Sequence, residues 1–346
     1  MGGTCLWDKE MERDMNKKRP LIIVMTPTRN EAWVLRAFLE ATSLWADHII
    51  IADQMSTDGS REIAKEYPKV ILIDNDRPDM QMAATRRLLF EEVKKIEGEK
   101  ILFALDADEF LSGDFVHTVD WEKIVNSQPD DSFTWRWMNL KRDDINKCFY
   151  GPHFYWGVHA SDDLWEGTFP DNFIHEWRLP WSPKADASHT FVLDAFCSIH
   201  LAWANQLRQK NKERFYQVST VGQNPKMSMV SVFRHYNTVR QESDYKEVPI
   251  HSYKYYDDHG LDIWEYIDMK DEGKYYTDEI LRYFDRDGIK RFALLDIWDM
   301  DWMQRNGVKD PRNGIQKLFH KYLRWTNPKS NHLIVRAIDK ILKQFV

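Results

Sequence analysis

Residues 101–110 have the sequence Ile-Leu-Phe-Ala-Leu-Asp-Ala-Asp-Glu-Phe, in which five apolar residues precede two aspartates spaced two positions apart. Such a run is typical of a strand buried on both faces, and alternate side chains of a strand point the same way. We therefore expect Asp106 and Asp108 to aim at one point from the strand end. Two converging carboxylates suit Mg²⁺ or Mn²⁺, which keeps positions for phosphate oxygens. An acidic loop at a sheet edge is the alternative reading of this pattern.

The preceding residues alternate between strand-like and helix-like patterns. Short runs rich in Ile, Val and Leu predict buried strands at 21–25, 48–52 and 70–73. Apolar residues at helical spacing predict helices around 35–42, from Ser60 to Tyr67, and through 88–96 with a stop at Gly98. This alternation predicts an α/β fold with a doubly wound, mostly parallel sheet and helices on both of its faces.

Three polar segments follow three of the predicted strands. They are residues 26–31 (TPTRNE), 53–60 (DQMSTDGS) and 106–109 (DADE). In a doubly wound sheet, ligands bind beyond the carboxyl ends of the strands, so the three segments are expected to share one rim. Gly59 and its short polar neighbours suit a turn with a helix cap, and we favour that role for residues 56–59.

These segments carry a family resemblance. PTRNEAWVLRAFLE (27–40), IIIADQMSTDGSREIA (49–64) and ILFALDADEF (101–110) resemble, in order and spacing, the successive signatures of family 2 glycosyltransferases, which have the GT-A fold. The resemblance holds for residues 19–112, about a third of the chain. A dinucleotide-binding domain has a similar sheet topology, but no G-x-G-x-x-G follows the first strand. The Walker A sequence of nucleoside-triphosphate-binding proteins is also not present.

The resemblance implies a nucleotide-sugar site. Asp53 would accept a hydrogen bond from the base, typically the N–H of uracil, because a carboxylate offers only acceptors. Gln54 departs from the family, which commonly has a second aspartate at that position. In the Arg86–Arg87 pair we prefer Arg86 as the residue that faces the ligand. The implied nucleotide-sugar-binding residues are Pro27, Thr28, Glu31, Asp53, Arg86, Asp106 and Ala107.

The resemblance also implies a metal site for Mn²⁺ or Mg²⁺. Asp108 would ligate the metal directly, and Asp106 would reach it through water or hold the ribose. The stretch Cys197-Ser198-Ile199-His200-Leu201 resembles a segment whose histidine completes the metal site in a subset of the family. His200 is therefore the third candidate ligand, and a core histidine is the alternative. Neutral imidazole is a competent ligand for Mn²⁺.

Family 2 enzymes generally invert the anomeric centre, which requires a general base on the acceptor side. The segment Phe173-Ile174-His175-Glu176 resembles the H-E motif of many such enzymes, so Glu176 is the candidate catalytic base alongside Asp108. Asp171 and Asp194 are alternatives as the base, and the structural alternative for Glu176 is an ion pair with Arg178 or a hydrogen bond that orients His175. Eight of the fifteen tryptophans lie between positions 121 and 203, and we expect most to be core, with one or two lining an acceptor cleft.

The sequence suggests four parts: a polar tail (1–18), a nucleotide-sugar-binding half (19–112), an acceptor-binding half (113–240) and a mainly helical C-terminal extension (241–346). In the last part, residues 310–346 contain eight Lys or Arg against two Asp, with an apolar stripe over 333–342. Such a stripe either packs on its own domain or lies on an anionic membrane surface.

Composition narrows the partners and the compartment. The 346-residue chain is 43% apolar, and its net charge of −7 gives no electrostatic footprint for nucleic acid. Three cysteines suggest no disulfide framework, which favours a reducing compartment. No apolar run approaches ~18 residues, so we expect neither a membrane span nor a signal peptide, and a cytoplasmic protein with peripheral membrane contact at most.

These observations together predict an inverting, metal-dependent glycosyltransferase. It would move a sugar from a nucleotide-sugar, with UDP favoured, to a hydroxyl acceptor such as a glycan or a lipid-linked carrier, as in cell-surface polysaccharide biosynthesis. One alternative is a non-catalytic nucleotide- or sugar-binding protein on the same fold. Another is a sugar nucleotidyltransferase, although such enzymes usually have a Gly-rich loop after the first strand and residues 26–31 contain no glycine.

Overall fold

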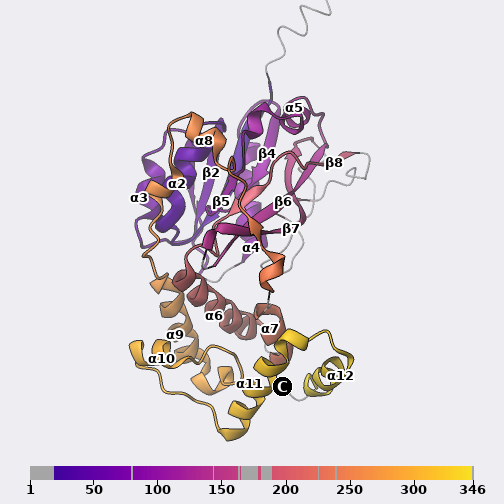
Figure 1. Cartoon of the computed structure of the whole chain (residues 1–346). Helices are drawn as coiled ribbons and strands as arrows, with labels where there is room; N and C mark the ends of the chain where they lie inside the picture. The colour runs from indigo at the N-terminus through magenta and orange to yellow at the C-terminus, as the bar shows by residue number, and fades with distance from the viewer. Residues whose placement is uncertain are drawn as a thin grey trace, which may run out of the picture. The chain divides into compact units, whose positions relative to one another are not determined.

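The computed structural model describes residues 19–78, 81–142, 144–162, 164, 178–180, 189–224, 226–237 and 240–344. The chain forms two compact units, each assembled from three stretches of sequence (Figure 1). The first unit comprises the described residues of Met1–Leu140, Tyr150–Leu201 and Val248–Asp268. The second comprises those of Lys141–Phe149, Ala202–Glu247 and Met269–Val346.

Four parallel strands form the sheet of the first unit at its N-terminal side, in the order β3-β2-β1-β4. They match the predicted strands within a few residues, and every residue of β4 is buried because this strand has neighbours on both sides. Their bounds are β1 (Leu21–Thr28), β2 (His48–Asp53), β3 (Val70–Asp74) and β4 (Lys100–Ala104).

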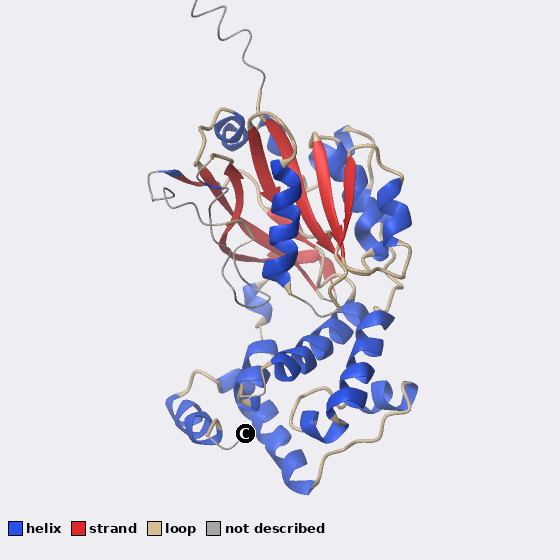
Figure 2. Cartoon of the chain, turned by 180° about the vertical axis from the view of Figure 1, so that it is seen from behind, coloured by secondary structure: helices blue, strands red, loops and turns tan. Residues whose placement is uncertain are grey.

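Three helices connect these strands: α2 (Ala32–Ser43), α3 (Ser60–Lys65) and α4 (Met82–Lys94). Figure 2 shows α4 lying across one face of the sheet, whereas α2 and α3 lie on the opposite face in Figure 1. The predicted α/β class, with a doubly wound sheet covered on both faces, is therefore confirmed.

The sheet continues beyond β4 in the order β7-β6-β9-β5, and β7 runs antiparallel to β4. Two short strands pair at the side, β8 with β6 and β10 with β7. The bounds are β5 (Glu109–Leu111), β6 (Ser132–Lys141), β7 (Asp144–His159), β8 (Thr190–Val192), β9 (Ser198–His200) and β10 (Lys246–Glu247). The helices of this region are η1 (Phe115–His117) and α5 (Val119–Val125).

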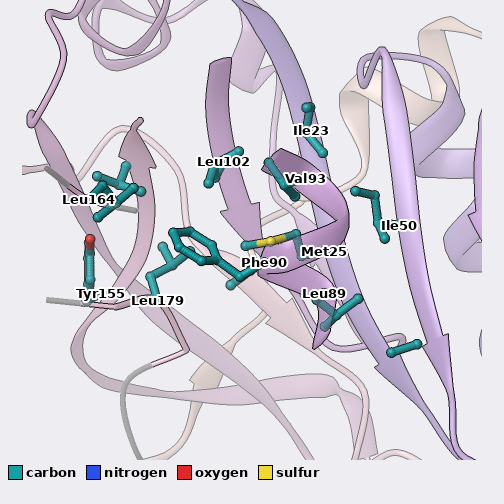
Figure 3. Close-up of a cluster of buried hydrophobic side chains, with 13 residues drawn as sticks. Ile23, Met25, Ile50, Leu89, Phe90, Val93, Leu102, Tyr155, Leu164 and Leu179 are labelled. Carbon is teal, nitrogen blue, oxygen red and sulfur yellow. The ribbon is translucent and has the colours of Figure 1, made fainter. Parts of the chain in front are cut away.

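A buried apolar cluster holds α4 on the sheet (Figure 3). Leu89, Phe90 and Val93 of α4 pack against Ile23, Met25, Ile50 and Leu102 of the strands, together with Tyr155, Leu164 and Leu179. Complete burial of one such side chain contributes about 1.5–3 kcal/mol. This packing turns the N-terminal half of α4, with Arg86, toward the carboxyl ends of β1 and β4.

Residues 248–268 complete the first unit through α8 (Lys254–Asp258) and η5 (Ile263–Tyr266), and the Asp268 N–H donates to the Trp33 carbonyl of α2 at 2.8 Å. The second unit is mainly helical, as predicted for the C-terminal extension. Among the described residues, no helix has both the length and the apolarity needed to cross a bilayer. The helices of the second unit are α6 (Gln206–Gln223), α7 (Met229–Tyr236), η4 (Glu242–Asp244), α9 (Lys274–Asp287), η6 (Ile289–Phe292), α10 (Met300–Arg305), α11 (Gly314–Thr326), η7 (Asn327–Lys329) and α12 (Leu333–Leu342).

Candidate metal and nucleotide site

The two aspartates of the D-x-D sequence lie in the turn that joins β4 to β5. The Glu109 N–H donates to the Asp106 carbonyl at 3.1 Å, and the Asp106 N–H donates to Oε2 of Glu109 at 2.8 Å. The expectation that strand alternation aims both aspartates at one point is wrong, because β4 already ends at Ala104. The turn instead directs Asp106 toward Arg178 and Asp108 toward His200, with Ala107 buried between them.

Strand pairing brings His200 next to Asp108. In the antiparallel register of β5 and β9, Glu109 lies opposite His200, and the Leu201 N–H donates to the Asp108 carbonyl at 2.9 Å. This register places Nε2 of His200 3.8 Å from Oδ2 of Asp108. Two ligands that each lie about 2.1 Å from one cation are separated by at most about 4.2 Å, so this spacing accommodates a shared ion.

Asn139 orients the His200 ring. β6 pairs with β9 in parallel, and their register puts Asn139 beside His200, with Oδ1 of Asn139 2.8 Å from Nδ1 of the imidazole. An amide oxygen only accepts hydrogen bonds, so Nδ1 carries the proton and the Nε2 lone pair is directed to the side of Asp108. The Trp137 ring stacks on the imidazole at a centroid distance of 5.4 Å and restrains its plane.

The donor set fits a divalent cation. Asp108, Glu109 and His200 have ligand atoms that all lie within 4.8 Å of one another. Oδ1 of Asp106 is buried and has no hydrogen-bond partner in the described part of the chain. A buried carboxylate oxygen without a partner costs free energy, and a cation or a ligand hydroxyl would remove that cost. Carboxylate oxygens with one imidazole suit Mn²⁺ and, less well, Mg²⁺.

Glu109 differs from the other acidic residues because all of its acceptor positions are occupied. Arg178 donates to Oε2 at 2.5 Å and to Oε1 at 2.8 Å. The Trp137 indole N–H donates to Oε1 at 2.9 Å, and the Asp106 N–H fills the fourth position. A carboxylate has about four lone-pair sites, so Glu109 has no acceptor left for a metal. Among the residues of this group, Asp108 and His200 are therefore the candidate direct ligands.

Arg178 is a buried cation at the centre of this cluster. Besides Glu109, its guanidinium donates to Oδ2 of Asp106 at 2.7 Å and to the Ala104 carbonyl at 3.2 Å, and it lies 4.7 Å from the centroid of the Trp156 ring. Burial lowers its pKa, but the neighbouring carboxylates, Asp106 first, raise it by more, so Arg178 stays charged.

Burial also dominates the electrostatics of Glu109. It raises the pKa of this carboxyl to about 7, against the opposing effect of the Arg178 charge. The four surrounding N–H donors each require an accepting oxygen, which is the geometry of an ionised carboxylate. With Glu109 ionised, Arg178 balances one of three carboxylates, and the cluster keeps a net negative charge that attracts a cation.

The nucleotide candidates of β1 and β2 meet at the next two strand ends. Asp53 is buried, and its Oδ2 accepts from the Ser56 N–H at 3.1 Å and from Arg61 at 2.9 Å. Its Oδ1 accepts the Thr28 hydroxyl at 3.3 Å and has no other recorded donor among the described residues. One acceptor position of Asp53 therefore remains for a ligand donor.

Glu31 lies between these two loops at the start of α2. Its N–H donates to the Ser60 hydroxyl at 2.9 Å, and its Oε2 accepts the Trp33 indole N–H at 2.6 Å. The Asp58 carboxylate accepts from Ser60 and from the first N–H of α2, and Gly59 has φ +98°, which favours glycine. The turn-and-cap role predicted for this segment agrees with these bonds.

A small cavity lies beside the D-x-D turn. Pro27, Arg86, Asp106 and Arg178 contribute to its lining, with Met25, Leu89 and Ala104 at its apolar side. Arg86 is buried on the inward face of α4, whereas Arg87 is exposed. The structure thus brings Pro27, Arg86 and Asp106 to one cavity, while Thr28, Glu31 and Asp53 are grouped in the adjoining loops of β1 and β2.

Of the three candidate general bases, only Asp194 lies within the described residues. Glu176, with its alternative Asp171, lies outside the described residues. The side chain of Asp194 is 70% exposed, and its Oδ1 lies 2.9 Å from Nε2 of His153.

The sequence interpretation did not identify Glu109, Arg178, Trp137 and Asn139 as parts of the site. Glu109 directly follows the D-x-D, which was a usable signal. Arg178 lies 69 residues from Glu109 in the chain, and no spacing rule predicts that they meet.

Comparison with known proteins supports the family resemblance. Residues 23–126 match the family described as Glycosyl transferase family 2. A curated relative, "Uncharacterized protein Rv3786c" of Mycobacterium tuberculosis, is 24% identical over 191 residues, which cover 49% of this chain and 46% of the relative. The chain therefore spans slightly less than half the length of that relative.

Two solved structures overlap with parts of this chain. Glucosyl-3-phosphoglycerate synthase from Mycobacterium tuberculosis, in complex with Mn²⁺, UDP and glucosyl-3-phosphoglycerate, is 16% identical, with a TM-score of 0.26 over 40% of this chain and 50% of that one. A nucleoside-diphosphate-sugar pyrophosphorylase from Vibrio cholerae is 10% identical, with a TM-score of 0.31 over 50% of this chain and 92% of that one. The fold assignment rests on the strand order and register described above.

Proposed function

We propose that this protein is an inverting, metal-dependent glycosyltransferase that uses a nucleotide-sugar donor, because residues 23–126 match the family described as Glycosyl transferase family 2. One observation carries the proposal. A buried carboxylate oxygen without a partner, on Asp106, lies in the same turn as Asp108, whose carboxylate faces the oriented Nε2 of His200. A buried carboxylate oxygen without a partner is uncommon in folded proteins, which favours an ion or a ligand group at this turn.

The donor would bind across the strand ends. Asp53 has one acceptor position left, which suits an imide N–H and therefore favours a uracil base, with Thr28 and Glu31 beside it. Arg86 faces the cavity that Asp106 also lines, so it would neutralise the diphosphate. Pro27 and Ala107 would contribute backbone and apolar contacts to the ribose and the diphosphate.

Asp108 and His200 would hold Mn²⁺ or Mg²⁺, and Asp106 would reach the ion through water or hold the ribose. When bound, such a cation stabilises the negative charge that develops on the β-phosphate as the sugar departs. Glu109 and Arg178 contribute by positioning: together they fix the turn that carries both aspartates.

The reaction then needs one proton acceptor. The acceptor hydroxyl oxygen forms a bond to the anomeric carbon from the face opposite the diphosphate, while the bond from that carbon to the β-phosphate oxygen breaks. The hydroxyl proton passes to a carboxylate, for which we propose Glu176, and the nucleoside diphosphate leaves. Asp194 is a weaker candidate, because it is largely exposed and already engaged with His153.

The acceptor would be a hydroxyl of a glycan or of a lipid-linked carrier, as in cell-surface polysaccharide biosynthesis. Contact of residues 310–346 with a membrane is part of the same proposal.

The test is a panel of UDP-, GDP- and other nucleotide-sugars, assayed for donor hydrolysis and transfer with Mn²⁺, with Mg²⁺ and after chelation. We expect turnover of one nucleotide class that chelation abolishes and that Asp108→Asn removes. Asp257→Asn, an exposed aspartate of α8, is the matched control and should retain activity. Glu176→Gln should keep donor affinity and lower transfer by ~10²–10⁴.

Two results would count against this proposal. Full activity after chelation would remove the metal from the mechanism. Consumption of a nucleoside triphosphate with a sugar phosphate, without turnover of any nucleotide-sugar, would identify a sugar nucleotidyltransferase instead.

A further inference from the structure

The last helix exposes its apolar side. Leu333 is 78%, Ile334 64% and Ile341 59% exposed, and Ile338, 39% exposed, lies at one edge of the same face. At 100° per residue these four side chains span about 140° of α12, which is a continuous apolar face. Among the described residues, this apolar stripe therefore does not pack against its own domain.

The opposite side of α12 attaches it to the second unit. Asp339 pairs with Arg234 of α7 at 2.9 Å and accepts the Tyr322 hydroxyl of α11 at 3.1 Å. Leu342 packs against a small cluster that contains Val230, Phe233 and Leu323. Because these polar and apolar contacts hold the narrow side of α12, its wide apolar side is fixed outward.

Helix α11 adds a second exposed apolar stripe. Ile315 is 79%, Leu318 67% and Trp325 72% exposed, whereas His320, Leu323 and Thr326 of the same helix are buried. Helical spacing puts the three exposed side chains within about 80° of one another. We call the seven exposed residues of both helices the C-terminal face: Ile315, Leu318, Trp325, Leu333, Ile334, Ile338 and Ile341.

The charges around the C-terminal face are almost all positive. Residues 310–346 contain eight Lys or Arg and two Asp, although the whole chain has a net charge of −7. Both aspartates are engaged in ion pairs, Asp310 with Arg312 and Asp339 with Arg234. Lys317 pairs with Asp310 and Arg324 with Asp296. Lys321 of α11, Arg336 and Lys340 of α12, and Lys343 just after it are exposed, so this part of an acidic protein presents a basic rim.

We propose that the C-terminal face docks on an anionic lipid bilayer. The large exposed apolar area requires an apolar partner, and the basic rim requires an anionic one; a bilayer with acidic headgroups supplies both in one surface. α11 and α12 would lie in the interface, with Ile and Leu side chains among the acyl chains and the Trp325 ring at headgroup level. The Lys and Arg side chains beside the apolar residues would add electrostatic attraction to such a surface, which salt weakens.

Vesicle co-sedimentation of the full chain tests this proposal without any assay of activity. Vesicles of phosphatidylcholine alone are compared with vesicles containing about a third phosphatidylglycerol, at low and high salt. We expect sedimentation with the anionic vesicles only, weakened by salt. Ile334→Ser with Ile338→Ser should reduce partitioning at least ~10-fold, because two isoleucine side chains that insert into the bilayer are lost.

Matched controls separate the C-terminal face from general stickiness. Met300→Ser changes another exposed apolar residue of the second unit, 83% exposed on α10, and should leave binding unchanged. Lys321→Glu with Lys340→Glu should abolish binding, whereas Lys274→Glu with Lys290→Glu, which changes net charge equally at exposed sites, should retain most of it. Melting temperatures of all variants show whether the fold is intact.

Three outcomes overturn the proposal. The first is that the full chain does not sediment with anionic vesicles at low salt. The second is that all variants bind like the parent. The third is that analytical ultracentrifugation shows a dimer that Ile334→Ser with Ile338→Ser dissociates while vesicle binding is absent. That last result would make the C-terminal face an interface between copies of this chain.

Discussion

The guanidinium of Arg178 donates to both carboxylate oxygens of Glu109, at 2.5 and 2.8 Å, and neither side chain is more than 7% exposed. Two charges removed from water in this way gain little net stability over an apolar pair, yet removal of one partner strands the other. The main contribution of this ion pair is positional. Through Asp106, the pair fixes the turn that carries the proposed metal ligands.

Arg178→Met should destabilise the protein by about 3–5 kcal/mol, because Glu109 then remains buried without its cation. Urea denaturation measures the loss, with Arg136→Met on the exposed side of β6 as the control. Arg178→Met combined with Glu109→Leu should recover much of the stability but not Mn²⁺ affinity, since Asp106 stays unanchored. Recovery of both properties would show that the pair is dispensable for the metal site.

Asn139→Leu should weaken Mn²⁺ binding by roughly 10–100-fold, the usual effect of removing the group that orients a ligating histidine. The Nδ1 proton of His200 would lose its acceptor, so the ring would no longer hold Nε2 toward Asp108. Calorimetric titration with Mn²⁺ measures the change. Asn139→Asp retains an acceptor and should bind at least as well as the parent; equal weakening in both variants would argue against the orienting role.

Asp53→Ala should reduce the affinity for a nucleoside diphosphate by ~1–3 kcal/mol, the cost of a lost hydrogen bond to a charged acceptor. Because Arg61 bridges Asp53 and Asp74, the control is Asp74→Ala, which removes the other partner of Arg61 and no ligand contact. Isothermal calorimetry compares the two variants. Equal affinities in Asp53→Ala and the parent would place the base elsewhere.

The second unit should lose stability in mild acid through His320. Its Nε2–H donates to the Leu294 carbonyl at 2.8 Å and its Nδ1 faces Arg312 at 3.1 Å, an arrangement that needs the neutral ring. Burial first, together with the charges of Arg312 and Arg324, lowers the pKa of His320 below 6.5.

The unfolded chain therefore binds this proton before the folded chain does. The His320 contribution is fully present above about pH 6.5 and is lost as the pH falls below it. Urea midpoints measured between about pH 8 and about pH 5 should decline less steeply for His320→Gln than for the parent. His332→Gln, an exposed neighbour, should follow the parental profile; a parental slope in His320→Gln would exclude this residue.

Local patterns predicted the parallel half of the sheet because β1 to β4 are continuous apolar runs. The next hundred residues lack such runs, so their strands were harder to predict. The positions of the polar loops followed from parallel topology. The directions of Asp106 and Asp108 did not, since a tight turn rather than a strand carries them. The neighbours of His200 depend on the register of β9 between β5 and β6, which no local spacing encodes.

The apolar stripe of α12 shows a different limit. Periodicity located its face in the sequence, but whether that face turns inward depends on Asp339 and Arg234, which lie 105 residues apart.

The way the chain alternates between its two units has a consequence for biosynthesis. The first unit needs residues up to Asp268, and the second needs Lys141–Phe149 as well as the C-terminus. A nascent chain on the ribosome can therefore complete the first unit only after Asp268 has been made, while the segments of the second unit made by then still lack their remaining partners. A truncation after Asp268 would keep every segment of the first unit but leave Lys141–Phe149 and Ala202–Glu247 without the rest of the second unit, so such a fragment should be aggregation-prone.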